Sequence, residues 1–223
     1  MSEKSSLVID SLCDQARGKN TTVVGLYCDF LAQQEQSNIS LLGAILKQLI
    51  SRGGVPGHIR EAFKEAKEEF SGRGLRLPNM VAILKKTIAS LQQIFVCVDA
   101  LDELAPGHRR GLLESLQEIV RVSPNIRILL TGRPHIDDEI AEFFPNAVRI
   151  PISPTQDDIK NYLEMRLKGD TTPKAMDGQL RADIMRIIPD KISEMLARIS
   201  NTSPIQVWVI THQPWFIVFF SLL

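Results

Sequence analysis

Residues 91–103 read L-Q-Q-I-F-V-C-V-D-A-L-D-E, and this stretch decides the fold of the chain. Ile94 to Val98 form an unbroken run of β-branched, aromatic and other apolar residues, which is typical of a strand buried on both faces. Such a strand belongs to a parallel sheet with helices on both sides. Three carboxylates follow it at once, from Asp99, Asp102 and Glu103. We expect them at the carboxyl edge of the sheet, where open α/β sheets bind their ligands.

The order of strand and carboxylates has the form of a Walker B motif, which serves a magnesium ion and a nucleotide. Asp99 would hold the water shell of Mg²⁺, because this ion keeps several waters and takes few protein carboxylates. Asp102 or Glu103 would then orient the attacking water. The alternative is an ordinary strand exit into a helix N-terminus, where the helix dipole favours acidic residues.

A candidate cation follows a second buried strand. Ile126 to Leu130 are all apolar apart from Arg127, and residues 131–134 read T-G-R-P. If this strand neighbours the first, Arg133 lies beside Asp99, where it would reach a γ-phosphate or pair with Asp102. The alternative is a loop arginine that happens to precede a proline.

Helices and strands alternate along the rest of the chain, which predicts an α/β fold with a parallel sheet and right-handed crossovers. Further strands are expected at residues 21–30 and 147–150. Asn38 or Ser40 is expected to cap the second helix, and Pro189 to separate two short helices within residues 172–197. Apolar spacing predicts the other helices at residues 5–17, 41–50, 56–70, 78–90, 106–122 and 156–168.

Composition limits the possible partners and compartment. Lys and Arg together number 26, as do Asp and Glu, so the net charge is zero. The overall charge therefore does not attract nucleic acid or an anionic membrane as a partner. Three cysteines in apolar segments, without metal or disulfide spacing, indicate a reducing compartment. The start, M-S-E-K-S-S, lacks the features of a secretory signal. We therefore expect a cytoplasmic protein.

Four segments, taken in order, resemble the NACHT nucleotide-binding domain, in the nephrocystin-type version common in large fungal proteins with ankyrin or other repeats. They are F-V-C-V-D-A-L-D-E (95–103), L-L-E-S-L-Q-E-I-V (112–120), I-R-I-L-L-T-G-R-P (126–134) and D-D-I-K-N-Y-L-E-M-R-L (157–167). The resemblance covers roughly Ser5 to Met195. It implies the STAND class of P-loop NTPases, which are switches controlled by ATP or GTP together with Mg²⁺. Members of this class assemble with other protein chains through the NACHT domain.

The same resemblance assigns roles to the candidate residues. Asp99 would serve Mg²⁺, Asp102 and Glu103 would serve hydrolysis, and Arg133 would sense the γ-phosphate. The phosphate-binding loop G-x-x-x-x-G-K-[ST], which supplies backbone N–H groups and a lysine, does not occur in the sequence. The helix at residues 5–17 corresponds to the one that follows this loop in the family. We therefore expect a partial P-loop NTPase (ASCE-type) sheet with weak or no nucleotide binding.

The strand that precedes the loop would also be absent. In this class it lies inside the sheet, between the strand at Ile126 to Leu130 and the short strand at Ala147 to Ile150. Its absence would leave two strand edges unpaired, and the chain only marginally folded and prone to aggregate.

The last part of the chain departs from the family. We divide the chain into a partial nucleotide-binding domain at 1–152, a helical continuation at 153–196 and an apolar tail at 197–223. Ile205 to Leu223 carry no charge and approach the roughly 20 residues that span a bilayer, although Pro214 interrupts them. The tail is a translated segment foreign to the family, a membrane anchor, or a strand-like plug at Ile205 to Ile210.

The sequence thus favours a fragment of a NACHT-type signalling NTPase. A non-enzymatic interaction module and a tail-anchored membrane protein are the alternatives.

Overall fold

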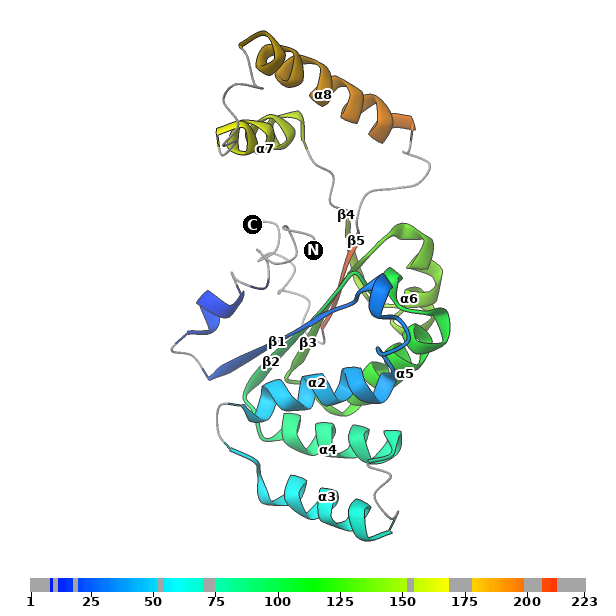
Figure 1. Ribbon diagram of the computed structural model, residues 1–223. Helices are drawn as coiled ribbons and strands as arrows, with labels where there is room; N and C mark the ends of the chain where they lie inside the picture. Colours follow the sequence, from blue (N-terminus) through cyan, green and yellow to red (C-terminus); the bar gives the residue numbers. More distant parts are fainter. Residues whose placement is uncertain are drawn as a thin grey trace. The chain divides into compact units, whose positions relative to one another are not determined.

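The computed structural model describes residues 9, 12–17, 20–51, 54–69, 75–151, 155–168, 178–198 and 206–211. The chain divides into two compact units (Figure 1). Unit 1 comprises Met1–Ile150 together with Val207–Leu223, and unit 2 comprises Pro151–Gln206. The chain therefore leaves the first unit, forms the second, and returns to the first at its C-terminal end.

Five strands form one sheet in the order β1-β2-β3-β5-β4. The first three are parallel, and Val24 of β1 lies opposite Val96 of β2, which lies opposite Ile128 of β3. The complete sheet is mixed, so the α/β class and the parallel core are confirmed while a wholly parallel sheet is not found. The strands are β1 (Thr21–Tyr27), β2 (Gln93–Asp99), β3 (Ile126–Gly132), β4 (Val148–Pro151) and β5 (Gln206–Ile210).

The central strands are buried on both faces, as their apolar runs predict. Alternate residues such as Val96 and Ile128 join the main core, whereas Cys97 and Leu129 are buried on the opposite face. That opposite face is covered in part by the helical residues near the N-terminus, since Ile9 lies 3.6 Å from the position a Cβ would take on Gly25. The central strands β2 and β3 are therefore buried between two layers, whereas the edge strands β1 and β4 are partly exposed.

Helices α2, α4 and α5 pack against one another on the side of the main core (Figure 1). Helix α3 packs on α4, and α6 on α5. In unit 2, α7 packs on α8. The helices are α2 (Asn38–Ile50), α3 (Gly57–Glu69), α4 (Leu77–Ala89), α5 (Pro106–Val122), α6 (Asp137–Phe143), α7 (Gln156–Lys168) and α8 (Gly178–Arg198), with short 3₁₀ turns η1 (Phe30–Ala32), η2 (Leu101–Glu103) and η3 (Pro134–Ile136).

Several predicted boundaries were wrong. Strand β1 ends at Tyr27 instead of residue 30, because the Asp29 carboxylate accepts a hydrogen bond from Leu31 N and begins the η1 turn. The N-cap of α2 is Ser37, whose hydroxyl accepts from Ser40 N, and neither Asn38 nor Ser40 holds that position. Helix α6 was missed, since seven residues are too few to display a helical period.

Pro189 does not separate two helices. It lies inside α8, which is continuous from Gly178 to Arg198. A proline in a helix removes one backbone donor and clashes with the preceding turn, at about 3 kcal/mol. The helix nevertheless continues through Pro189, and it packs on α7.

Strand β5 occupies the place in the sheet that we expected to be vacant. It lies between β3 and β4, and its five residues are buried. Trp208 and Ile210 belong to the main core, and Trp208 Nε1 donates a hydrogen bond to Asp137 Oδ1 at 3.1 Å. Of the three interpretations of the tail, the structure thus contains the strand-like plug. The expectation of two unpaired strand edges at this position was wrong.

The described part of the chain shows no membrane anchor of the helical kind. None of the helices formed by those residues is both long and apolar enough to cross a bilayer. Residues 212–223, which make up most of the proposed anchor, lie outside the described residues.

Candidate functional site

The carboxyl ends of β2 and β3 meet at the candidate site. Asp99, the last residue of β2, is buried, and its Oδ1 accepts a hydrogen bond from the Thr131 hydroxyl of β3. The same hydroxyl oxygen accepts from Ala100 N at 3.0 Å. Thr131 therefore holds both the candidate magnesium carboxylate and the first residue after the strand.

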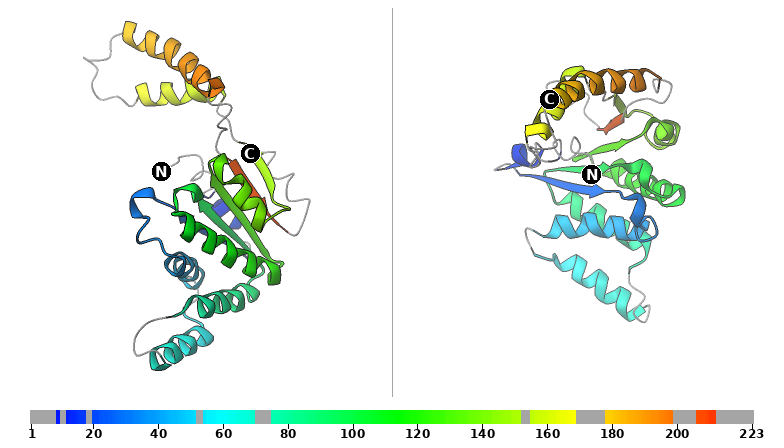
Figure 2. Two further views of the ribbon diagram at one scale, coloured as in Figure 1. Left: turned by 90° about the vertical axis from the view of Figure 1, so that its right-hand side faces the viewer. Right: turned by 45° about the horizontal axis from the view of Figure 1, so that its top comes forward.

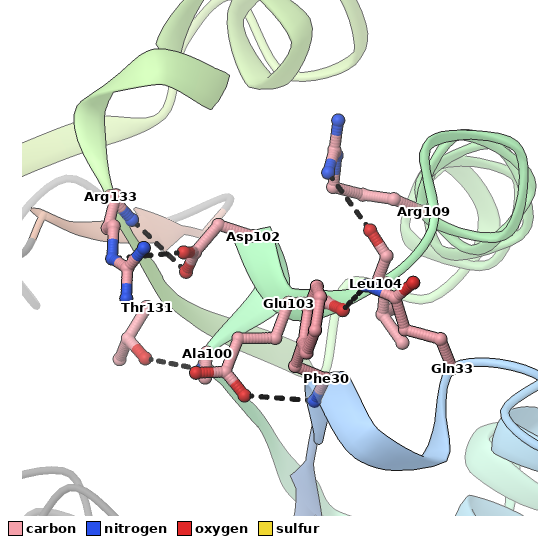
Figure 3. Close-up of polar contacts among 9 residues, drawn as sticks. All are labelled: Phe30, Gln33, Ala100, Asp102, Glu103, Leu104, Arg109, Thr131 and Arg133. Carbon is pink, nitrogen blue, oxygen red and sulfur yellow. Dashed lines mark hydrogen bonds and ion pairs between the residues drawn. The ribbon is translucent and has the colours of Figure 1, made fainter.

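Ala100 turns the chain out of the sheet in an unusual backbone conformation. Its φ of 54° and ψ of 45° lie in the left-handed region, which it alone among the described non-glycine residues enters. This region costs an L-residue about 1–2 kcal/mol. The turn directs Asp102 and Glu103, which follow in η2, toward two different neighbouring loops (Figure 3).

Asp102 faces the end of β3. Its side chain is only 6% exposed, its Oδ1 accepts from Arg133 N at 3.2 Å, and its Oδ2 lies 3.5 Å from Arg133 Nε. A Cβ on Gly132 would lie 3.2 Å from Asp102 Oδ1 and 3.0 Å from Ile136 Cδ1, so a glycine permits this close approach. The predicted pairing of Arg133 with Asp102 is confirmed. The guanidinium end stays open to ligands, because the Arg133 side chain is 69% exposed.

Glu103 faces the end of β1. Its Oε2 accepts a hydrogen bond from Phe30 N at 3.2 Å, and its carbonyl oxygen accepts from Gln33 Nε2 at 2.6 Å. Both contacts bind the η1 turn to η2, as Figure 3 shows. The strand ends support the same junction, since Cys28 N donates to the Asp99 carbonyl at 3.0 Å.

The junction is electrostatically negative. Burial raises the pKa of the Cys28 thiol from 9.0 to about 12, and the charges of Asp99, Glu103 and Asp102 add to the effect. The pKa of Cys97 is also raised to about 12, mainly by burial and further by Cys13 and Asp99. Three carboxylates thus act on one small volume, which favours a cation.

Closed metal sites are not found among the described residues, because no three His, Cys, Asp or Glu side chains are placed to hold an ion. Mg²⁺ needs no such cage, since one or two carboxylates, waters and substrate phosphates complete its shell. Asp99, fixed by Thr131 at a strand end, fits the part of that single carboxylate.

Other site residues were not singled out from the sequence. Thr131 and Gln33 act through contacts that join distant segments, and no local pattern marks such contacts. Arg109 of α5 is buried, donates to the Leu104 carbonyl at 3.2 Å and pairs with Glu139 of α6 at 2.7 Å. Arg109 thereby connects the segment after η2 to α5 and α6. Its position in the first turn of a predicted helix did not indicate that the side chain would be buried.

Fold and site together define a class of protein. It is an α/β protein with carboxylates and an arginine at the carboxyl ends of two adjacent parallel strands. The family model described as nephrocystin 3, N-terminal matches residues 3–133, which is more than half of the chain. The chain belongs to this family. The matched range includes β1, β2 and β3 and ends at Arg133. A comparison with curated proteins finds no match.

Proposed function

We propose that this chain carries the magnesium and sensor half of a NACHT-type P-loop NTPase, a nucleotide-controlled switch of the STAND class. One observation supports this most directly. Asp99 ends β2, Asp102 and Glu103 lie in the η2 turn after it, and Arg133 follows the end of the neighbouring strand β3. All four residues therefore lie at the same edge of the sheet. Ligands of open α/β sheets bind at this edge.

The contacts support a division of roles among these residues. Asp99, held by Thr131, would accept the water shell of Mg²⁺. Glu103, with Asp102, would orient the attacking water. Arg133 has a backbone fixed by Asp102 and an exposed guanidinium, so it would contact the γ-phosphate of ATP or GTP.

The isolated chain should bind nucleotide weakly or not at all. Its sequence contains no phosphate-binding loop, so a polyphosphate would meet Asp99 and Arg133 without the backbone N–H groups that normally hold it. We expect calorimetric titration with Mg-ATP and Mg-GTP to give no micromolar dissociation constant. A micromolar constant would contradict this part of the proposal.

The roles themselves are tested in a longer chain that is restored with a strand and phosphate loop before residue 5. Asp99→Asn should abolish Mg²⁺-dependent hydrolysis, whereas Glu103→Gln should keep nucleotide binding and turn over slowly. Because β5 fills the sheet between β3 and β4, the restored chain should be made with and without residues 206–223. Equal loss of binding in both variants would refute the division of roles.

A non-enzymatic interaction module is the second candidate. It is favoured by β5, which completes the sheet from within the same chain and leaves the fold independent of a nucleotide-binding segment. A restored chain that neither binds nor hydrolyses nucleotide, while remaining folded, would favour this candidate.

A further inference from the structure

Strand β1 forms one outer edge of the sheet, and its exposed backbone groups need partners (Figure 2). In a parallel pair, the N–H and C=O of one residue point to the same side, and consecutive residues alternate. Cys28 N donates to the Asp99 carbonyl of β2, so residue 28 faces the sheet. Gly25, Tyr27 and Asp29 therefore direct their backbone groups outward.

Two glutamine side chains meet these outward groups. The Gln48 amide binds Gly25 on both sides: its Oε1 accepts from Gly25 N at 3.0 Å, and its Nε2 donates to the Gly25 carbonyl at 2.8 Å. The Gln36 amide bridges two residues, since its Oε1 accepts from Asp29 N at 3.2 Å and its Nε2 donates to the Tyr27 carbonyl at 3.4 Å. Each amide makes the pair of bonds that a residue of a further strand would make.

Helix α2 and the segment that leads into it place both amides along the strand. Gln36 precedes its N-cap Ser37, and Gln48 lies in its last turn. The helix runs opposite to β1 and packs on it, so its beginning meets the end of β1 and its last turn meets Gly25. The two contacts thus come from the segment that leads into α2 and from the last turn of the helix.

The composition of β1 makes such protection necessary. Edge strands usually avoid pairing with other chains through charges, prolines or short length. The sequence of β1, T-T-V-V-G-L-Y, contains no charge or proline and is rich in residues that favour strands. The opposite edge strand, β4, has only four residues and ends in Pro151. The side-chain amides of Gln36 and Gln48, which we call the amide clamps, therefore cover the edge of β1. At β4, the short strand and its proline limit pairing with other chains.

We propose that the outer edge of β1 is a strand-docking edge held shut by the side-chain amides of Gln36 and Gln48, and that its partner when opened is β1 of a second copy of this chain. Two copies would pair antiparallel about a twofold axis, which brings the same uncharged residues together from both sides. No like charges on β1 oppose this pairing.

Hydrogen exchange on the wild-type chain tests the clamps directly. The amides of Gly25 and Asp29 should exchange slowly although they belong to an edge. Gln48→Ala should speed exchange at Gly25 by about tenfold and leave Asp29 unchanged, while Gln36→Ala should do the reverse. Unprotected exchange at Gly25 in the wild-type chain, or no response to Gln48→Ala, would overturn the proposal.

Self-association tests the partner. By size-exclusion chromatography with light scattering, the Gln36→Ala/Gln48→Ala variant should form dimers and larger species as its concentration rises. Adding Gly25→Pro, which removes an outward donor from the edge, should return it to the wild-type state. Gln33→Ala is the matched control, because its amide binds the Glu103 carbonyl and not β1.

A folded double variant that associates no more than the wild-type chain would refute the docking edge. Association that Gly25→Pro leaves unchanged would refute β1 as the contact. If the double variant loses its cooperative melting transition, the exchange rates of the two single variants decide the proposal.

Discussion

Replacing Trp208 with alanine measures how far β5 stabilises the sheet. The Trp208 side chain is 3% exposed and belongs to the main core, and its indole N–H bonds to Asp137 of α6. Truncation of a buried tryptophan to alanine costs about 3–5 kcal/mol. The whole stability of a domain is only about 5–15 kcal/mol, so the variant should lose a large share of it.

Trp208→Phe is the matched variant, because it keeps most of the ring and loses the hydrogen bond. Asp137 retains Arg149, whose Nη1 lies 2.7 Å from its Oδ2, and its side chain is 24% exposed. Water and Arg149 can therefore replace the lost donor. We expect Trp208→Phe to cost about 1–2 kcal/mol, including the smaller ring.

Thermal melting by far-ultraviolet circular dichroism provides the assay. One kcal/mol shifts the melting temperature of a chain of this size by about 2–4 °C, so Trp208→Ala should lower it by roughly 6–20 °C. Deletion of residues 205–223 should lower it further, since all of β5 is lost. A Trp208→Ala chain that melts like the wild-type protein, or a deletion that only improves solubility, would show that β5 does not pack between β3 and β4.

Two further predictions concern buried charges and thiols. Arg109→Ala should lower the unfolding free energy in urea by about 3 kcal/mol, because it leaves the Glu139 carboxylate, 20% exposed, without its partner. Arg110→Ala is the control on the same helix: it removes the solvent-exposed pair with Glu142 and should change the unfolding free energy little. Equal effects of the two substitutions would refute the role of burial. Because the pKa values of Cys28 and Cys97 are raised from 9.0 to about 12, the native state keeps both protons while the unfolded state releases them. Stability should therefore be fully present below pH 9 and fall from there toward pH 12, and the fall should be shallower in a Cys28→Ala/Cys97→Ala variant measured by urea unfolding over that range.

Local sequence patterns determined much of the fold. The bounds of α5 and α7 were predicted residue by residue, because Pro106 begins the first and Thr155 caps the second. The Thr155 hydroxyl accepts from Asp158 N at 3.1 Å. Apolar runs located β2 and β3, and parallel neighbours must end at one edge, so the meeting of Asp102 and Arg133 was also predicted.

The place of β5 was a matter for the tertiary structure. From the sequence we favoured a foreign tail over a membrane anchor or a strand, because an uncharged apolar segment is compatible with all three and only the family resemblance distinguishes among them. What selects the strand is the space between β3 and β4, which are earlier in the chain and separated from β5 by the whole of unit 2. Sequence patterns cannot encode that choice, since it depends on a vacancy formed by other segments.

The same holds for polar partners. Sequence alone determined that carboxylates follow a buried strand and that an arginine follows its neighbour, because side-chain period and strand ends are local properties. Only the tertiary structure decided that Glu103 holds η1, that Arg109 is buried, and that Gln36 and Gln48 cover the edge of β1. A polar side chain bonds to whatever group lies within about 3 Å, and which group that is follows from the packing of segments far apart in the chain.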